Sequence, residues 1–433
     1  MAKRFAFLHY ESFKIKMSIK RIRKGMAMPQ FQTQESERKD GMNRLNVYLI
    51  ALGAFLTGTA ELAVAGILPA LAEDLDISVA LAGQFVTAYS LAFAIGTPIL
   101  VALTSRMGRK LVLIGSLAVF IAGCAVAVFS TVFAVLLVSR ILLGLGAGVY
   151  SVLAISSTAR LVPPDKIGGA ISIIGFAFGS ALTLGVPIGI AVTGIWGWRS
   201  IFTLLGLISL VILAALARLL PSIEGDAPAP FRAQLRVSRE PAIVSGFALS
   251  LLLCAGNALL LTYLTTYLGD VLSMGTALAG TAMFVLGVFS MIGSRAGGFG
   301  VDRWGAARTI VVTVALSAAA LAVLPAAASV RIVGLALLAV WMFALFATAP
   351  GLQTYFIRLS PGAADFVLGL NTSVIHLGTA AGAAVGGALV HSASTVYYHP
   401  WAAGLIYVLA LGAAALSFAL RGRHLPAGTQ EAK

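Results

Sequence analysis

The sequence predicts an all-α membrane protein with twelve transmembrane helices in two pseudo-symmetric bundles of six. Charged residues make up only 11% of the 433 residues, whereas a soluble domain has about 25%. Uncharged stretches long enough to cross a bilayer, which takes about 20 apolar residues, recur along the chain. These stretches cover residues 77–105, 167–198, 241–269, 332–357 and 366–420. A β-barrel would show short segments of alternating hydrophobicity instead.

Twelve spans follow from these stretches and their charged flanks. They are 45–70, 79–104, 111–130, 133–156, 167–192, 200–220, 242–268, 275–296, 309–328, 332–357, 366–390 and 400–420. Connections are short except for residues 221–241, which are charged and proline-rich and separate six spans from six. We therefore expect bundles at 45–220 and 242–421, joined by a cytoplasmic linker. The two ends of the chain, 1–44 and 422–433, are predicted to be cytoplasmic tails.

Basic residues indicate the orientation. With twelve spans, both termini lie on one side, and that side holds 27 of the 30 Lys and Arg residues. Basic residues mark the cytoplasmic side, so we expect both termini inside the cell. The net charge of +14 is then mostly a topology signal. Without interleaved aromatic and basic residues, no nucleic-acid partner is expected. Trp198, Trp304 and Trp401 fall near span ends, as in an interfacial aromatic belt.

The first 44 residues carry eleven Lys or Arg residues and four acids, and they lack the apolar core of a signal peptide. Two interpretations remain open. The segment is a disordered basic arm that touches anionic lipid, or translation begins downstream, since Met17, Met26, Met28 and Met42 all lie within it. Either interpretation predicts a tail that transport does not need.

Short motifs recur at a nearly constant offset between the two halves. At an offset of 197 residues, "SRMG" (105–108) matches "DRWG" (302–305). At an offset of 203 residues, "GFAFG" (175–179) matches "GTAAG" (378–382), and Trp198 matches Trp401. Parallel repeats of six spans predict two bundles related by an axis along the membrane normal. Such bundles support alternating access, with the substrate held near mid-membrane at their interface.

An ordered set of motifs resembles one family over about residues 45–421. The motifs are "GTAELAVAGILPALAEDLDIS" (58–78), "TSRMGRK" (104–110), "RILLGLGAG" (140–148), "GFAFGSALTLGVPIG" (175–189), "GWRSIF" (197–202) and "GVDRWG" (300–305). Together they resemble the major facilitator superfamily, in particular its twelve-span drug:proton antiporter branch. Within that branch, the first and fourth of these motifs look most similar to bacterial purine base, nucleoside and arabinose efflux proteins.

The resemblance implies a secondary transporter of the bacterial inner membrane. It would couple proton entry to efflux of a small neutral or weakly polar solute, such as a purine, nucleoside, sugar or a drug like chloramphenicol. A proton-coupled uptake symporter is the alternative, and a non-transporting membrane sensor a weaker one. No enzyme signature is present. We expect a monomer in the lipid bilayer whose partners are its solute and protons, with no cofactor and no metal.

The resemblance also assigns conformational roles to the two loop motifs and the fifth span. The residues concerned are Ser105, Arg106, Gly108, Arg109, Asp302, Arg303, Gly305, Gly175, Gly179, Gly185, Pro187 and Gly189. Ser105 stands where the family has Asp, so the latch of the first half should be weaker, and Arg106 needs another partner. Asp302 is kept, which favours a charged clamp at a tight turn. Pro187 should bend the fifth helix, and its glycines permit close helix approach, although generic packing explains them equally well.

Glu61 and Arg140 are the only charged residues well inside the predicted spans. A charge at a helix centre costs roughly 2.5–3.5 kcal/mol on insertion scales. At about 1.5 Å per residue, both residues lie roughly 10–13 Å below the outer ends of their helices. The two side chains are thus expected to meet, directly or through water. The pair is either a permanent salt bridge or a proton-coupling site, and the resemblance favours the second.

Further polar side chains inside the spans are candidates for the substrate cavity. They are Gln84, Tyr89, Asn257, Asn371 and His376. Asn257 and Asn371 offer the paired donors and acceptors that a purine edge needs. His376 either titrates or forms a hydrogen bond between helices.

Overall fold

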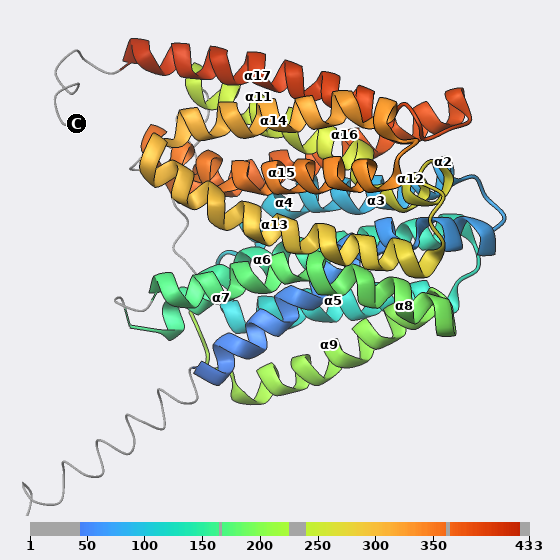
Figure 1. Ribbon diagram of the computed structural model, residues 1–433. Coiled ribbons are helices and arrows are strands. Elements are labelled where there is room, and N and C mark those ends of the chain that lie inside the picture. The colour runs from blue at the N-terminus through green and yellow to red at the C-terminus, as the bar shows by residue number, and fades with distance from the viewer. Residues whose placement is uncertain (1–43, 164–166, 225–239, 361–363, 425–433) are drawn as a thin grey trace, which may run out of the picture.

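The computed structural model describes residues 44–163, 167–224, 240–360 and 364–424 (Figure 1). Within these ranges, twelve helices are long and apolar enough to cross a membrane, as the sequence predicted. Nearly all of the basic tail, the middle of the linker (225–239) and the C-terminal residues from 425 onward lie outside the described residues.

The first six spans are partly built from more than one helical segment. The first helix runs from Arg44 to Asp74. The second span consists of α2 (Val79–Ala82), α3 (Gln84–Leu91), η1 (Ala92–Gly96) and α4 (Thr97–Thr104). The third and fourth spans are single helices, α5 (Arg109–Phe129) and α6 (Phe133–Leu161). The fifth span consists of α7 (Ile167–Ser180), η3 (Ala181–Gly185) and α8 (Val186–Trp196), and the sixth is α9 (Arg199–Leu219).

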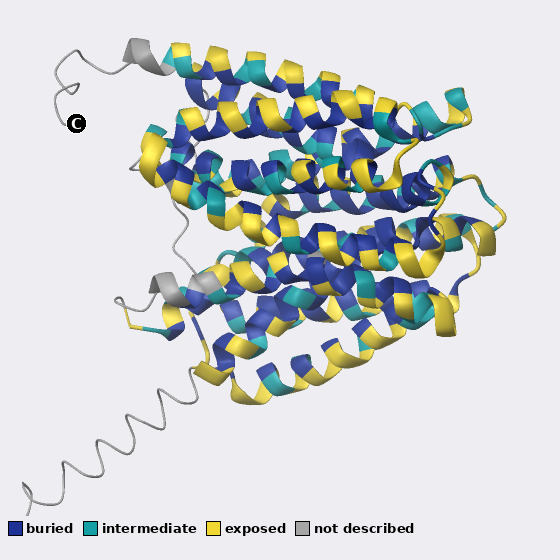
Figure 2. Ribbon diagram, in the orientation of Figure 1, coloured by how far each residue is buried: buried dark blue, intermediate teal, exposed yellow. Residues whose placement is uncertain are grey.

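The last six spans are more regular. They are α11 (Pro241–Leu261) continued by α12 (Leu264–Asp270), α13 (Thr276–Trp304), α14 (Ala306–Ala327), α15 (Arg331–Leu359), α16 (Ala364–Ala393) and α17 (His399–His424). The α11, α14 and α16 helices all pack against neighbours in this half, and α5 packs in the same way against α6 and α9 in the first half. Exposed residues lie on the outside of the helix assembly (Figure 2).

Glycines bring the helices of the second half into backbone contact. Added Cβ atoms at Gly378 and Gly382 of α16 would overlap carbonyl oxygens of α11. Those at Gly293 and Gly297 of α13 would do the same on α15. Small residues at such crossings allow the close approach on which helix association in lipid depends.

Two spans contain a π-helical turn directly before a proline. The turns are η1 and η3, and the prolines are Pro98 and Pro187, each the second residue of the helix that follows. A proline has no N–H to donate, and a wide π turn accommodates the missing bond. The expected irregularity at Pro187 is therefore present, and the second span contains an equivalent that the sequence analysis missed.

Two pairs of spans contribute much of the packing between the two halves. The second span packs against α16 of the eleventh, and α13 of the eighth packs against η3 and α8 of the fifth. Both irregular helices of the first half thus face the second half (Figure 1), and the first helix also contacts it.

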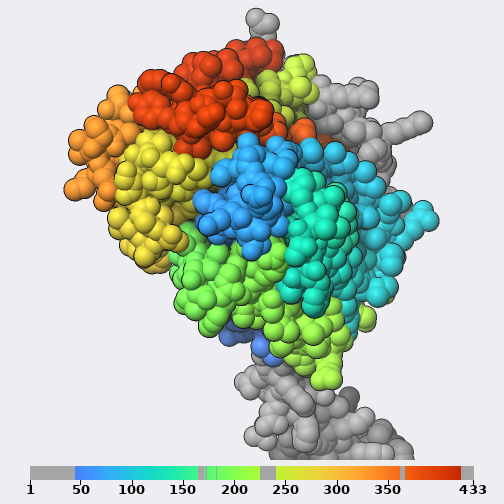
Figure 3. All heavy atoms as spheres, turned by 90° about the vertical axis from the view of Figure 1, so that its right-hand side faces the viewer, coloured from blue at the N-terminus to red at the C-terminus, as the bar shows by residue number. Residues whose placement is uncertain are grey.

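Contacts between the halves are found toward the end opposite the chain termini. The Thr265 hydroxyl donates to the Ala65 carbonyl at 2.8 Å. The Tyr263 hydroxyl lies where a Cβ on Gly83 would be, and a Cβ on Gly287 would lie 2.6 Å from the Thr183 Cα. Figure 3 views this end and shows atoms of both halves in contact across its centre. We refer to it as the outer end, because it carries the loops that the charge pattern predicts to face outward.

The packing of these helices is looser toward the inner end, although α4 still approaches α16. Added Cβ atoms at Gly175 and Gly179 of the fifth span would find no atom of the described chain within 4 Å. The same holds for Gly298 of α13 and Gly369 of α16. The structure is therefore closed at the outer end, with these inner glycines unpacked.

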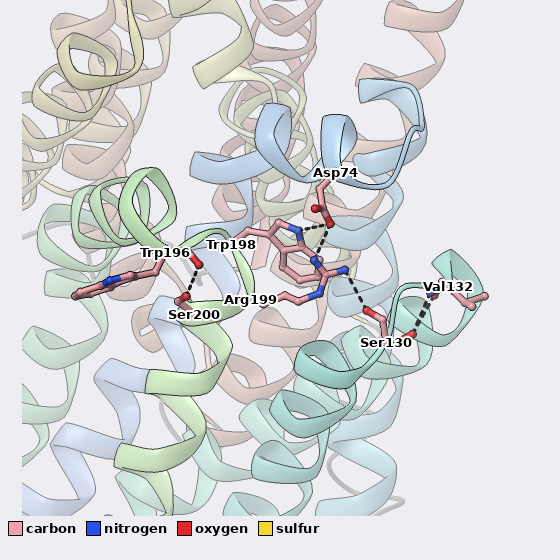
Figure 4. A network of polar contacts seen from close by, with 7 residues as sticks. All are labelled: Asp74, Ser130, Val132, Trp196, Trp198, Arg199 and Ser200. Carbon is pink, nitrogen blue, oxygen red and sulfur yellow. Dashed lines mark hydrogen bonds and ion pairs between the residues drawn. The ribbon is translucent and has the colours of Figure 1, made fainter.

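A polar network joins three helices at the outer end of the first half (Figure 4). The Asp74 carboxylate accepts hydrogen bonds from Trp198 Nε1 at 3.0 Å and from Arg199 Nη1 at 2.7 Å. Arg199 also donates to the Ser130 carbonyl, and its guanidinium lies 4.3 Å from the Trp198 ring centroid. Trp198 is only 4% exposed. Its expected place in an interfacial belt is wrong, because this network draws the ring inward.

Candidate functional site

Glu61 of the first helix lies beside His376 of α16, across the interface between the halves. The distance from Glu61 Oε1 to His376 Nδ1 is 3.6 Å, and the two side chains are 24% and 10% exposed. The Phe93 ring of η1 stacks on the imidazole, with ring centroids 3.5 Å apart. The site thus combines an acid from one half with a titratable base from the other.

Arg140 of α6 does not pair with Glu61. Its Nε donates to the Phe85 carbonyl at 3.2 Å and its Nη1 to the Ala60 carbonyl at 3.1 Å. The guanidinium also lies 4.8 Å from the Tyr89 ring centroid. Among the described residues no ion pair joins Arg140 to Glu61, so the expected direct contact is not made. The guanidinium instead donates a hydrogen bond to the carbonyl of Ala60, the residue just before Glu61.

Tyr89 and Gln84 lie on the second span, near the interface. Tyr89 is buried, and its hydroxyl has no hydrogen-bond partner among the described residues. Buried polar atoms normally have a partner, so this hydroxyl is available to a solute or to water. Gln84 lies next to Gly387 of α16, where its amide lines the contact between the halves rather than the acid–base pair.

The two asparagines do not form a joint site with the acid–base pair. At 100° per residue, Asn371 is turned about 140° from His376 around α16. It lies instead on the face that carries Gly378 and Gly382, which pack on α11. The Oδ1 atoms of Asn257 and Asn371 are both buried without a partner among the described residues.

The apolar and backbone parts of the site were not predicted from the sequence. Phe93 and the carbonyls of Ala60 and Phe85 gave no signal, because an aromatic ring or a carbonyl in an apolar span looks the same in any helix. The π turn at Ala92–Gly96 offered one usable hint, since Gly96 and Pro98 repeat the spacing of Gly185 and Pro187.

The glycines assigned to the fifth span behave in two ways. Gly185 packs against Thr59 of the first helix, and Gly189 packs against Ile201 of α9. Gly175 and Gly179 pack against nothing that the structure describes, as noted above. Close packing was thus the right expectation for the outer pair of glycines and the wrong one for the inner pair in this conformation.

Two residues of the first loop motif form hydrogen bonds with the residues that follow the sixth span. The Arg109 amide donates to the Ile223 carbonyl at 2.9 Å, and Lys110 Nζ donates to Leu220. Gly108 has an ordinary φ of −57°. Arg106 is exposed and forms no ion pair within the described ranges.

The second loop motif forms a one-residue turn between α13 and α14. Gly305 has φ +81°, a conformation that favours glycine, as expected for a tight turn. Asp302 and Arg303 are exposed, and neither forms an ion pair with a residue that the structure describes. The expected clamp is therefore not formed here. The motif lies at the inner end, where the glycines named above are unpacked.

Comparison with known proteins identifies relatives over most of the chain. The profile of the Major Facilitator Superfamily matches residues 50–383. The chain is 31% identical over 376 residues to the uncharacterized MFS-type transporter YbcL of Bacillus subtilis strain 168, covering 87% of this chain and 96% of YbcL. It is 30% identical over 364 residues to the uncharacterized MFS-type transporter YtbD of the same strain, and this match covers 83% of this chain and 91% of YtbD.

Solved structures share the fold at lower identity. A D-xylose-proton symporter is 19% identical with a TM-score of 0.69, covering 84% of this chain and 95% of that protein. The human organic anion transporter MFSD10 is 21% identical with a TM-score of 0.65, and the match covers 88% of this chain and 99% of MFSD10.

Proposed function

Because the chain belongs to the Major Facilitator Superfamily, whose members are transporters rather than enzymes, we propose that it is a proton-driven efflux antiporter. One observation carries the proposal: the contact between Glu61 and His376 joins a titratable group of each half at 3.6 Å. A proton on that pair acts on the interface whose opening and closing constitutes alternating access.

Charge balance explains how a proton would bias the interface. A carboxylate beside a neutral imidazole carries one net negative charge, and a buried uncompensated charge is costly. One added proton brings the pair to zero net charge, whichever ring or carboxyl atom holds it. Proton uptake at Glu61 or His376 would thus stabilise the outer-closed arrangement in which the two groups meet.

Arg140 would set the proton affinity of the pair from a distance. Two backbone carbonyls and the Tyr89 ring hold its guanidinium beside the first helix. Its positive charge favours the Glu61 carboxylate after the proton has left, because opposite charges attract across a medium of low dielectric constant. Proton release into the cell would then free the site for solute, and solute binding would return the transporter to the outward-facing state.

The character of the site favours a neutral or weakly polar solute. Within the described spans Glu61 is the one acid near mid-membrane, and its neighbour His376 is stacked on the Phe93 ring. A purine, nucleoside, sugar or amphiphilic drug such as chloramphenicol fits this chemistry. The proposal includes a bacterial inner-membrane location with both termini cytoplasmic.

Transport in inside-out vesicles tests the proposal. Vesicles with an acidic interior are mixed with labelled adenine, arabinose or chloramphenicol. Antiport predicts accumulation that collapses with the pH gradient, whereas uptake symport predicts accumulation in right-side-out vesicles with an acidic exterior. Glu61→Gln should lose gradient-driven accumulation but keep solute exchange without a gradient. Glu73→Gln is the matched control, because Glu73 is an exposed acid on the same helix.

The outcomes separate coupling from structure. Loss of both accumulation and exchange in Glu61→Gln would indicate a folding or binding defect, and His376→Gln would then be the deciding variant. Wild-type accumulation by both variants would overturn the proposed role of the pair.

A further inference from the structure

An apolar groove of about 420 Å³ lies on the second half, away from the interface between the halves. Its walls are Trp304 of α13, Ala307, Arg308, Val311 and Val312 of α14, and Phe418 of α17. Trp304 and Val312 are each 53% exposed. Among the described residues the main neighbours of α14 are α13, α15 and α17 of the second half. Because Val311 and Val312 are exposed, this face is turned toward the surrounding membrane.

The groove has one charge, placed at one end. Arg308 lies in the first turn of α14, beside the α13–α14 turn at the end of the molecule that carries the termini. It is exposed, and no residue that the structure describes forms an ion pair with it. Val311 and Val312 follow three and four residues later, so they line the same face one turn deeper in the membrane.

This order of groups matches the order of groups in a phospholipid. A guanidinium at the membrane surface binds a phosphate with two parallel hydrogen bonds. An indole beside it suits the headgroup level, and the valines and phenylalanine below it suit an acyl chain. Basic pockets on the cytoplasmic side recurrently bind anionic headgroups.

The first half supplies an internal contrast. At the offset of 197 that relates the two loop motifs, Arg308 corresponds to Leu111, which is itself exposed. The repeated fold therefore does not require a cation at this position. In the first half the cations of this turn are Arg109 and Lys110 instead, and Lys110 donates to the Leu220 carbonyl.

We propose that this groove binds one anionic phospholipid from the surrounding bilayer. Its phosphate contacts Arg308, and its acyl chain lies along Val311, Val312 and Phe418. The lipid would hold the α13–α14 turn to α17 on the membrane-facing side.

Native mass spectrometry of the full chain tests the site. The protein is purified in detergent, depleted of lipid, and titrated with phosphatidylglycerol or phosphatidylcholine of identical acyl chains. The wild-type protein should retain one phosphatidylglycerol at concentrations that leave phosphatidylcholine unbound. Arg308→Gln should weaken this retention about tenfold, a loss of about 1.4 kcal/mol. Arg358→Gln is the matched control, because Arg358 is an exposed cation in the last turn of α15, outside the groove.

A second pair of variants tests the apolar floor without changing charge. Val312→Thr should weaken retention severalfold, whereas Val323→Thr, an exposed valine of the same helix outside the groove, should not. Equal losses in Arg308→Gln and Arg358→Gln would show general attraction to basic protein and overturn the site. Equal retention of the two lipids would overturn the preference for an anionic headgroup, because both lipids carry a phosphate and only phosphatidylcholine also carries a cation. Unchanged retention in Arg308→Gln and Val312→Thr would overturn the proposal entirely.

Discussion

The outer and inner ends of the interface between the halves use the same helices in opposite ways. In the outer half of α13, Gly287 lies so close to Thr183 that a Cβ would be 2.6 Å from the Thr183 Cα. At the inner end, Gly298 of the same helix and Gly175 of the fifth span have free space. Small residues therefore line both ends, but only one end is packed. We therefore expect the inner glycines to enter a contact only in another conformation of the transporter.

The sequence repeat adds a second contrast. Gly378 and Gly382 match Gly175 and Gly179 in sequence, but they pack on α11 within their own half. Gly378 and Gly382 thus form a helix contact within the second half, whereas Gly175 and Gly179 are unpacked. A shared spacing of glycines predicts the capacity for close approach, but it does not predict the partner.

The largest expected effect comes from filling the packed end. Gly287→Val should prevent outer closure, because the atom in its way is backbone and has little freedom to move. Overpacking costs typically 1–3 kcal/mol, which corresponds to a shift of about 5- to 150-fold away from the outer-closed state. A disulfide can report that state, since a Cβ on Gly280 would lie 3.9 Å from Ile190 Cβ, within the usual disulfide range of about 3.5–4.5 Å.

The reporter is the yield of the Ile190→Cys, Gly280→Cys cross-link with Cys124 and Cys254 replaced by alanine. Gly298→Val is the control, because it adds the same side chain to the same helix in open space. A cross-link yield that stays at the wild-type level in Gly287→Val would mean that the outer contact is not specific to one state.

The second prediction concerns the open end. Gly175→Val should fold normally and leave the cross-link yield unchanged or higher, because nothing in the described chain lies within 4 Å of the new Cβ. Solute transport should nevertheless fall severalfold if the inner ends must close during the cycle. Transport at the wild-type rate, in protein that is present in the membrane in normal amount, would show that Gly175 never enters a contact.

The third prediction tests whether the outer network stabilises the first half rather than the interface. Asp74→Asn removes the ion pair to Arg199, which is partly exposed at both ends. Exposed pairs contribute roughly 0.2–1 kcal/mol, so the thermal midpoint in detergent should fall slightly while the cross-link yield stays constant. Glu73→Gln is the neighbouring control. A change in cross-link yield without a change in midpoint would place the network in the conformational switch instead.

Twelve spans and the tight turn at Gly305 were predictable because hydropathy and backbone sterics act locally along the chain. The partner of Glu61 was not predictable in the same way. Matching depth drew attention to Arg140, which does lie beside the first helix, but the guanidinium binds the Ala60 carbonyl instead of the carboxylate. Contact with His376 depends on which end of the interface is closed and on the rotation of α16, and neither property is encoded in a local pattern.

The smallest expected effect concerns the loop motif that lost its acid. Ser105 borders a cavity of about 230 Å³ at the inner end, which Arg109 also lines. Its hydroxyl donates only to Ala102 of its own helix. Ser105→Asp would place a carboxylate in this cavity, and the attraction to nearby cations should matter most when the inner ends close. We expect the Ile190–Gly280 cross-link yield to fall about two- to threefold, equivalent to about 0.4–0.65 kcal/mol. Ser105→Asn is the uncharged control of the same size. If both variants change the yield equally, the effect is steric, and the missing acid of the first half has no part in the balance between the two closures.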